Sequence, residues 1–151
     1  MRSRAERWSR YERALTLITV ALLFAIPVID KLPGPYPPDW FSAKFGGTLV
    51  DLFPGALALA FGLITIAEVV VPALALIALI RGEHREPPAA QAGAGFADHA
   101  LAGATLLLLA LTVGSLIARD YGNAFNDFGY LVGVLVLRRF AFPSSESSPA
   151  N

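Results

Sequence analysis

Residues 52–80 read LFPGALALAFGLITIAEVVVPALALIALI, an apolar run in which Glu68 is the only formally charged side chain. The run is longer than the ~20 apolar residues that a membrane-spanning helix needs. An ionisable group at membrane depth costs about 2.5–3.5 kcal/mol on insertion scales, so it usually faces a bundle interior or a wet cavity. The run therefore predicts an integral membrane protein, with Glu68 as its first functional candidate.

The composition of the whole chain favours the same class of protein. Its 151 residues are 55% hydrophobic and only 16% charged, whereas a soluble domain has roughly 25% charged residues. The net charge is zero, and no basic patch lies away from the flanks of the apolar runs, which argues against nucleic-acid binding. Because the chain has no cysteine, disulfides, iron–sulfur ligation and thioether-attached haem are excluded.

Four apolar segments predict an all-α, integral membrane four-helix bundle. The helices are expected at about residues 10–31, 54–80, 96–118 and 124–140. They form one domain over residues 1–142, followed by a tail at 143–151 that we expect to be disordered. Pro72 removes the amide that would bond to the Glu68 carbonyl. Asn123 is the expected N-cap of the fourth helix.

A proline-rich connector and an aromatic stretch separate the first two predicted helices. Residues 33–38 read PGPYPP, and proline lacks the amide donor and fixes φ, so this connector is stiff and non-helical. In residues 40–53, apolar side chains recur at helical spacing: Phe41, Phe45, Leu49 and Leu52. We expect a short interfacial or re-entrant helix here, with Trp40 at headgroup level. An ordinary surface loop is the alternative.

The distribution of arginine and lysine predicts the topology. The four-helix arrangement puts nine basic residues on the side of the two termini: Arg2, Arg4, Arg7, Arg10, Arg13, Arg81, Arg85, Arg138 and Arg139. The opposite side has three: Lys31, Lys44 and Arg119. An excess of Lys and Arg marks the cytoplasmic side, so both termini are predicted to be cytoplasmic, that is N-in/C-in.

Glu68 has two competing interpretations. Burial favours the neutral acid unless a cation pairs with it, which suits a proton relay or a polar contact for a quinone or an exported ligand. Alternatively, the acid bonds to a hydroxyl on a neighbouring helix and fixes the packing. The candidate hydroxyl partners are Thr16, Thr19, Thr105, Thr112 and Ser115. Glu68→Gln separates the two, because a packing role should survive this change and a proton role should fail.

A second group of polar residues lies at the outer ends of the predicted helices. Asp30 and Lys31 are expected to line a mouth together with three residues near the fourth helix, if the first and fourth helices are neighbours. These three residues are Asn126, Asp127 and Arg119. The alternative is interfacial snorkelling by Lys31 and a first-turn acid at Asp127 that the helix dipole favours.

Two further patterns bear on partners. His84 and His99 lie near a long polar connector without tight ligand spacing, so no metal site is predicted there. Gly129 and Gly133 form a GxxxG pattern in the fourth predicted helix. This pattern is common in membrane helices and leaves a homodimer open.

The chain resembles the DoxX-like membrane proteins over roughly residues 10–140. The resemblance rests on an arginine-led first helix that ends at Lys31 and on the aromatic stretch that follows it. A second helix then begins at Pro54-Gly and carries Glu68 at its centre. The chain departs from the family at Val71-Pro72, where members often show a glycine after the glutamate.

The resemblance implies a multi-pass protein of the bacterial inner (plasma) membrane. It also implies that Lys31 and Glu68 are the site residues carried over from the family. Some members of the family are subunits of quinone-linked oxidoreductases such as the thiosulfate-oxidising kind. The chain has no redox-active residue or cofactor ligand set of its own, so a quinone or a membrane or peripheral partner protein must carry the electrons. We therefore expect a redox-associated or accessory membrane subunit, at most a non-catalytic one, without a covalently bound cofactor. A small proton-coupled transporter and a purely structural or assembly subunit of a membrane complex are the alternatives.

Overall fold

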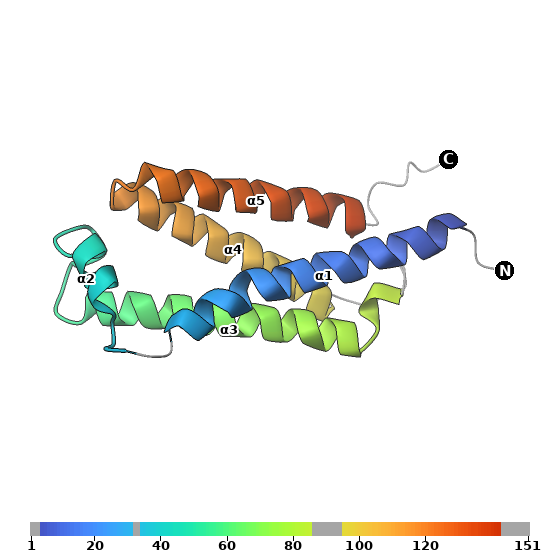
Figure 1. The fold of residues 1–151 in the computed structure, drawn as a ribbon, viewed down its shortest axis with the longest axis horizontal. Coiled ribbons are helices and arrows are strands. Elements are labelled where there is room, and N and C mark those ends of the chain that lie inside the picture. The colour runs from blue at the N-terminus through green and yellow to red at the C-terminus, as the bar shows by residue number, and fades with distance from the viewer. Residues whose placement is uncertain (1–3, 32–33, 86–94, 143–151) are drawn as a thin grey trace.

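The computed structural model describes residues 4–31, 34–85 and 95–142, and this part of the chain is all-α, without a strand. It contains five α-helices and one 3-10 helix: α1 (Arg4–Lys31), α2 (Asp39–Phe45), α3 (Ala56–Ile80), η1 (Glu83–Arg85), α4 (Phe96–Ile117) and α5 (Tyr121–Ala141). The four long helices α1, α3, α4 and α5 run along the long axis of the molecule, and α2 lies across one end (Figure 1).

Three helices in the described ranges are long and apolar enough to cross a membrane. These segments are Ser9–Lys31, Ala56–Ile80 and Phe96–Ile117. Their length and composition indicate a membrane protein, as predicted. The helix α5 is not one of the three, because its first half carries the polar residues Asn123, Asn126 and Asp127.

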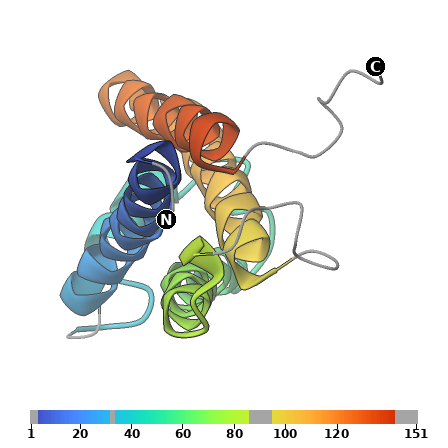
Figure 2. The ribbon, with the colours of Figure 1, turned by 90° about the vertical axis from the view of Figure 1, so that its right-hand side faces the viewer.

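Small side chains let the long helices approach closely. α1 packs on α3, α3 on α4, and α4 on α5, as the end-on view shows (Figure 2). Alanines fill much of the α3–α4 contact, including the fully buried Ala75 and Ala100. A Cβ built on Gly103 of α4 would lie 3.0 Å from Val71 Cγ2 of α3. Small residues at such contacts are what membrane helices use to pack without a hydrophobic drive from water.

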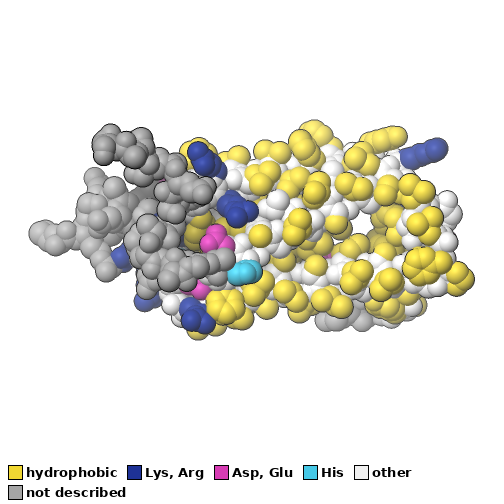
Figure 3. All heavy atoms as spheres, turned by 180° about the vertical axis from the view of Figure 1, so that it is seen from behind, with side chains coloured by type: hydrophobic (Ala, Val, Ile, Leu, Met, Phe, Trp, Pro, Cys, Tyr) yellow, Lys and Arg dark blue, Asp and Glu magenta, His cyan; other side chains and the backbone are white. Residues whose placement is uncertain are grey.

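Large apolar side chains point outward along the length of the molecule. The viewed face is mostly hydrophobic, with Lys and Arg side chains gathered at one end (Figure 3). Leu106 on α4 is 68% exposed, and Ile66 on α3 is 61% exposed. Exposed apolar area of this extent is uncommon on soluble monomers. It fits helices whose outer faces contact lipid.

Most helix ends follow the predictions closely, but α1 begins at Arg4, six residues before the predicted start, and α5 begins three residues early. α1 ends at Lys31 as expected, and α3 and α4 differ from the predicted ranges by two residues or fewer. The helix α5 begins at Tyr121, so the prediction of Asn123 as its N-cap was wrong. Arg119 takes a φ of 57°, which turns the chain early and puts Asp120 at the cap. The Asn123 amide donates to Asp120 Oδ1 at 3.2 Å.

The predicted interfacial helix exists, but it is shorter than expected. It is the seven-residue α2, which ends before Gly46 and Gly47. Gly47 has a φ of 71°, a conformation that glycine adopts without steric cost and that turns the chain out of the helix. The predicted extent to residue 53 was therefore wrong. Leu49 and Leu52, expected on the helix face, are exposed residues outside it.

The two ends of the helical part lie together. The start of α1 and the end of α5 are at the same end of the molecule, opposite α2 (Figure 1). An even number of membrane crossings requires this arrangement. The predicted disordered tail at 143–151 lies outside the described residues, as do residues 86–94 of the connector before α4.

Candidate functional site

Glu68 is buried in the middle of α3 and pairs with Lys31, the last residue of α1. Lys31 Nζ lies 2.6 Å from Glu68 Oε1 and 2.5 Å from Oε2, so it bonds both carboxylate oxygens. The Glu68 side chain is 4% exposed and the Lys31 side chain 14%. This is a charge-assisted contact with little access to solvent, the type of hydrogen bond that is stronger than a neutral one.

The pairing depends on where α1 stops. Because the proline-rich connector begins at residue 33, α1 ends at Lys31, short of the α2 end of α3 (Figure 1), and the Lys31 side chain reaches Glu68. Lys31 thus stands at the carbonyl end of its helix, where the helix dipole favours a cation. Its Nζ also lies 5.7 Å from the centroid of the Phe61 ring, within cation–π range. The carboxylate, the helix end and the ring all stabilise the ammonium.

The hydroxyl partners predicted for Glu68 are engaged elsewhere. Thr16, Thr105 and Thr112 each donate to the carbonyl four residues earlier in their own helix, at 2.8 Å. This back-bonding is the usual choice of a helical threonine in an apolar environment. Ser115 donates to Asp127 instead. The prediction that one of these four hydroxyls bonds to Glu68 was therefore wrong. The partner is Lys31, which the sequence had suggested as a residue of the outer mouth or as a snorkelling cation.

A cavity of about 760 Å³ opens next to this pair. Residues from all five α-helices line it. Its walls are mainly apolar and aromatic, with Trp40, Phe41, Phe45 and Phe61 among them. The polar side chains in the lining are Lys31, Lys44, Ser115, Asn123 and Asp127. Small-molecule sites in proteins have this size and this mixture of apolar walls with a few polar groups.

An aromatic cluster fixes α2 against α3 and forms one wall of the cavity. The Phe61 ring centroid lies 5.1 Å from that of Phe41 and 5.4 Å from that of Tyr36, both in edge-on geometry. Tyr36 Oη also donates to the Ala58 carbonyl at 3.1 Å. A Cβ at position 62 would collide with this Tyr36 hydroxyl, so Gly62 allows the connector to lie on α3. Edge-to-face pairs add to the area that the rings bury.

The polar side of the cavity joins α2 to the start of α5. Lys44 Nζ lies 2.8 Å from Asp120 Oδ2, and Asn123 Nδ2 donates to the same oxygen at 2.6 Å. The hydrogen bond from Lys44, followed by that from the Asn123 amide, lowers the pKa of Asp120 below its ordinary value. Deeper along α5, the half-buried Asp127 accepts a hydrogen bond from Ser115 Oγ at 3.2 Å.

The structure brings together only part of the predicted outer group. Lys31 and Asp127 line the cavity, but Asp30 and Asn126 are exposed and do not. Arg119 lies instead beside a separate pocket with Gly47 and Thr48. The five residues expected to form one mouth therefore do not line a common cavity in the structure. Lys44 was not expected in a site from the sequence, although its place between Phe41 and Phe45 at helical spacing was a usable signal.

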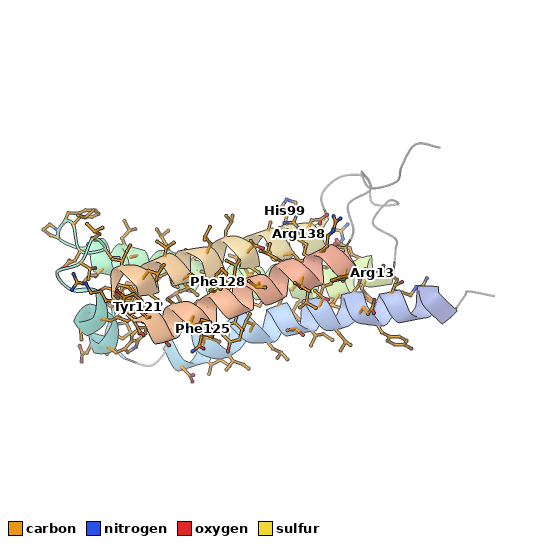
Figure 4. All side chains as sticks on the ribbon, turned by 90° about the horizontal axis from the view of Figure 1, so that it is seen from above. Arg13, His99, Tyr121, Phe125, Phe128 and Arg138 are labelled. Carbon is orange, nitrogen blue, oxygen red and sulfur yellow. The ribbon has the colours of Figure 1, made fainter. Side chains whose placement is uncertain are left out.

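The outer side of α5 carries exposed aromatic residues instead of a site. Tyr121, Phe125 and Phe128 follow the first half of this helix (Figure 4), and Phe125 is 76% exposed. A Cβ at Gly129 or Gly133 would meet nothing within 4 Å in the described part of the chain. The GxxxG pattern therefore lies on an open face.

Polar contacts also form at the end of the molecule away from α2, where Arg13, His99 and Arg138 lie (Figure 4). Glu83 accepts hydrogen bonds from the Phe96 and Ala97 amides and so caps α4. Arg13 Nε donates to the His84 carbonyl at 3.0 Å. Burial, reinforced by nearby arginines, lowers the pKa of His84. No group of three or more His, Cys, Asp or Glu side chains in the described ranges is arranged to hold a metal ion.

Comparisons of the chain with protein-family profiles, with curated proteins and with solved structures give no match. The resemblance to the DoxX-like proteins consequently stays a prediction.

Proposed function

We propose that this protein is a redox-associated or accessory subunit of the bacterial inner membrane that binds a quinone-type ring in the cavity beside the Lys31–Glu68 pair. The observation that carries the proposal is the cavity of about 760 Å³, with its aromatic walls and few polar groups. In this proposal α1, α3, α4 and α5 all cross the membrane, and both termini are cytoplasmic because arginines gather at their end.

The lining chemistry suits such a ligand. Trp40 and Phe61 offer ring faces and edges against which a flat ring packs favourably. Lys44 keeps N–H donors beyond the one used for Asp120, and these donors can bond to a ring oxygen. The chain supplies no redox cofactor ligands, so the electrons pass between the quinone and a partner protein. The protein therefore binds and orients the ring, and no residue is assigned a catalytic role.

Glu68 has a positioning role in this proposal. Both of its oxygens are bonded to Lys31, and Lys31 rather than Glu68 lines the cavity. The Glu68 carboxylate binds the Lys31 ammonium group and so positions the Lys31 side chain in the cavity wall. A proton-coupled transporter would need Glu68 to exchange a proton with a substrate. Both Glu68 oxygens accept hydrogen bonds from Lys31, so neither oxygen is free for that exchange.

Tryptophan fluorescence tests the proposal. The chain has two tryptophans, so Trp8→Phe leaves Trp40 in the cavity wall as the only reporter. Titration of this variant in nanodiscs with a short-chain benzoquinone is expected to give saturable quenching. Gly114→Phe should abolish the saturable part, since Gly114 lines the cavity. Gly129→Phe is the matched control, because a Cβ there meets nothing within 4 Å.

If quenching rises linearly with quinone, and equally with and without Gly114→Phe, it reports only collisions in the bilayer. That result would contradict the proposal. A purely structural or assembly subunit would give that result. It would then also be recovered with a stable partner after mild-detergent pull-down and mass spectrometry.

A further inference from the structure

The two lysines in the cavity lining already have carboxylate partners. Lys31 donates to both oxygens of Glu68, and Lys44 donates to Asp120. An ammonium group has three N–H donors, so Lys44 can still bond to one ligand oxygen beside Asp120.

Asp127 is a carboxylate in the cavity lining that has no cation partner among the described residues and keeps one oxygen unused. Its Oδ2 accepts from Ser115 Oγ, and in the described part of the chain its Oδ1 has no hydrogen-bond partner. A carboxylate accepts but does not donate. The cavity therefore presents an unused acceptor on the α5 side, and this acceptor calls for a donor on the ligand.

The spacing along α5 separates the two polar contacts. Asp120, which binds Lys44, and Asp127 are seven residues apart, or about 10 Å along the helix axis. The cavity thus has a donor at one level and an acceptor two turns away. A ring with oxygen atoms on opposite edges can address both, provided that the oxygen near Asp127 carries a hydrogen.

We propose that Asp127 makes the cavity selective for the reduced, hydroxyl-bearing form of its ring ligand. This inference rests on the proposed function and names the form of the ligand that binds. A hydroxyl donates to Asp127 Oδ1, while the opposite oxygen accepts from Lys44. A carbonyl in the same place would set its lone pairs against those of the carboxylate and leave both groups without a hydrogen bond, which is unfavourable.

The test compares three forms of one short-chain ring by quenching of Trp40 in the Trp8→Phe background: the quinol, the quinone and the quinol dimethyl ether. The ether keeps the oxygens but cannot donate. Since the chain has no cysteine, a thiol reductant can hold the quinol reduced without altering the protein. The quinol is expected to bind about tenfold more tightly than either other form, the usual scale for one unpaired buried acceptor.

Asp127→Asn should reduce this preference to near one while quinone binding persists, which also shows that the cavity has kept its shape. Asp120→Asn is the control, and it should weaken all three forms together without changing their ratio. Equal binding of quinol and quinone by the unmodified site, or an unchanged ratio in Asp127→Asn, would overturn this inference alone. Absence of saturable quenching by every form would overturn the proposed function as well.

Discussion

Lys31 and Glu68 form the contact that links the end of α1 to the centre of α3. Taking two charges out of water is costly, and their attraction compensates only when the geometry is good. Here both carboxylate oxygens are bonded and the ammonium lies near the Phe61 ring. Such a pair adds little net stability compared with well-packed apolar side chains. Loss of either partner is nevertheless strongly destabilising, because the other charge stays buried and unpaired.

Removing one partner of this pair is expected to destabilise the protein strongly. Glu68→Gln and Lys31→Met should each lower the free energy of unfolding by about 3–5 kcal/mol, because each leaves a buried charge without its partner. The double variant Lys31→Met/Glu68→Leu should recover most of the loss. Unfolding in mixed micelles, followed by circular dichroism over an SDS titration, measures all four proteins. Additive losses in the double variant would contradict the pairing.

The contact between α3 and α4 is an example of packing through small side chains. Gly103 of α4 allows Val71 of α3 to approach, whereas Gly129 on α5 faces no other described residue within 4 Å. Two glycines in similar helical positions thus have different neighbours. The difference is invisible in composition and appears only when the helix faces are known.

Leucine at these two glycines should have opposite consequences. Gly103→Leu is expected to force α3 and α4 apart and to cost about 1–3 kcal/mol, the usual penalty for overpacking. Gly129→Leu should leave the free energy of unfolding unchanged or raise it slightly, because helix propensity improves. The same SDS titration compares them. A change in oligomeric size on Gly129→Leu, measured by analytical ultracentrifugation, would instead show that this open face binds a second copy.

The distribution of charge over the whole molecule favours one orientation in the membrane. Lys and Arg side chains gather at the end where α1 begins and α5 finishes (Figure 3). The opposite end, around α2, has Lys44 bound to Asp120. In the proposed orientation the basic end is cytoplasmic, which would place the cavity in the outer half of the bilayer.

Cysteine accessibility tests this orientation, and the chain has no native cysteine to interfere. Ala43→Cys on α2 and His99→Cys on α4 place single thiols at exposed positions near opposite ends. A membrane-impermeant maleimide added to spheroplasts should label position 43 at once and position 99 only after permeabilisation. The reverse order would invert the proposed topology, and immediate labelling of both would contradict a crossing by α3, the long helix between the two positions.

Local sequence was enough to predict the helices and the class of protein. Length and hydropathy of an apolar run depend on neighbouring residues only, so α3 and α4 were predicted within two residues of their ends. The stop of α1 at Lys31 followed from the prolines after it. Glu68 was identified as a candidate for the same reason, since its burial cost can be inferred from the run that surrounds it.

The partners of these residues depend on how the helices are offset and rotated against one another. Lys31 and Glu68 are 37 residues apart in the sequence, and they meet because α1 packs along α3. The cavity lining comes from five helices, so no periodicity in one segment could show that Lys44 and Asp127 belong to it while Asp30 and Asn126 do not. Hydropathy places a side chain in the membrane, and only the packing of the helix faces decides what it contacts there.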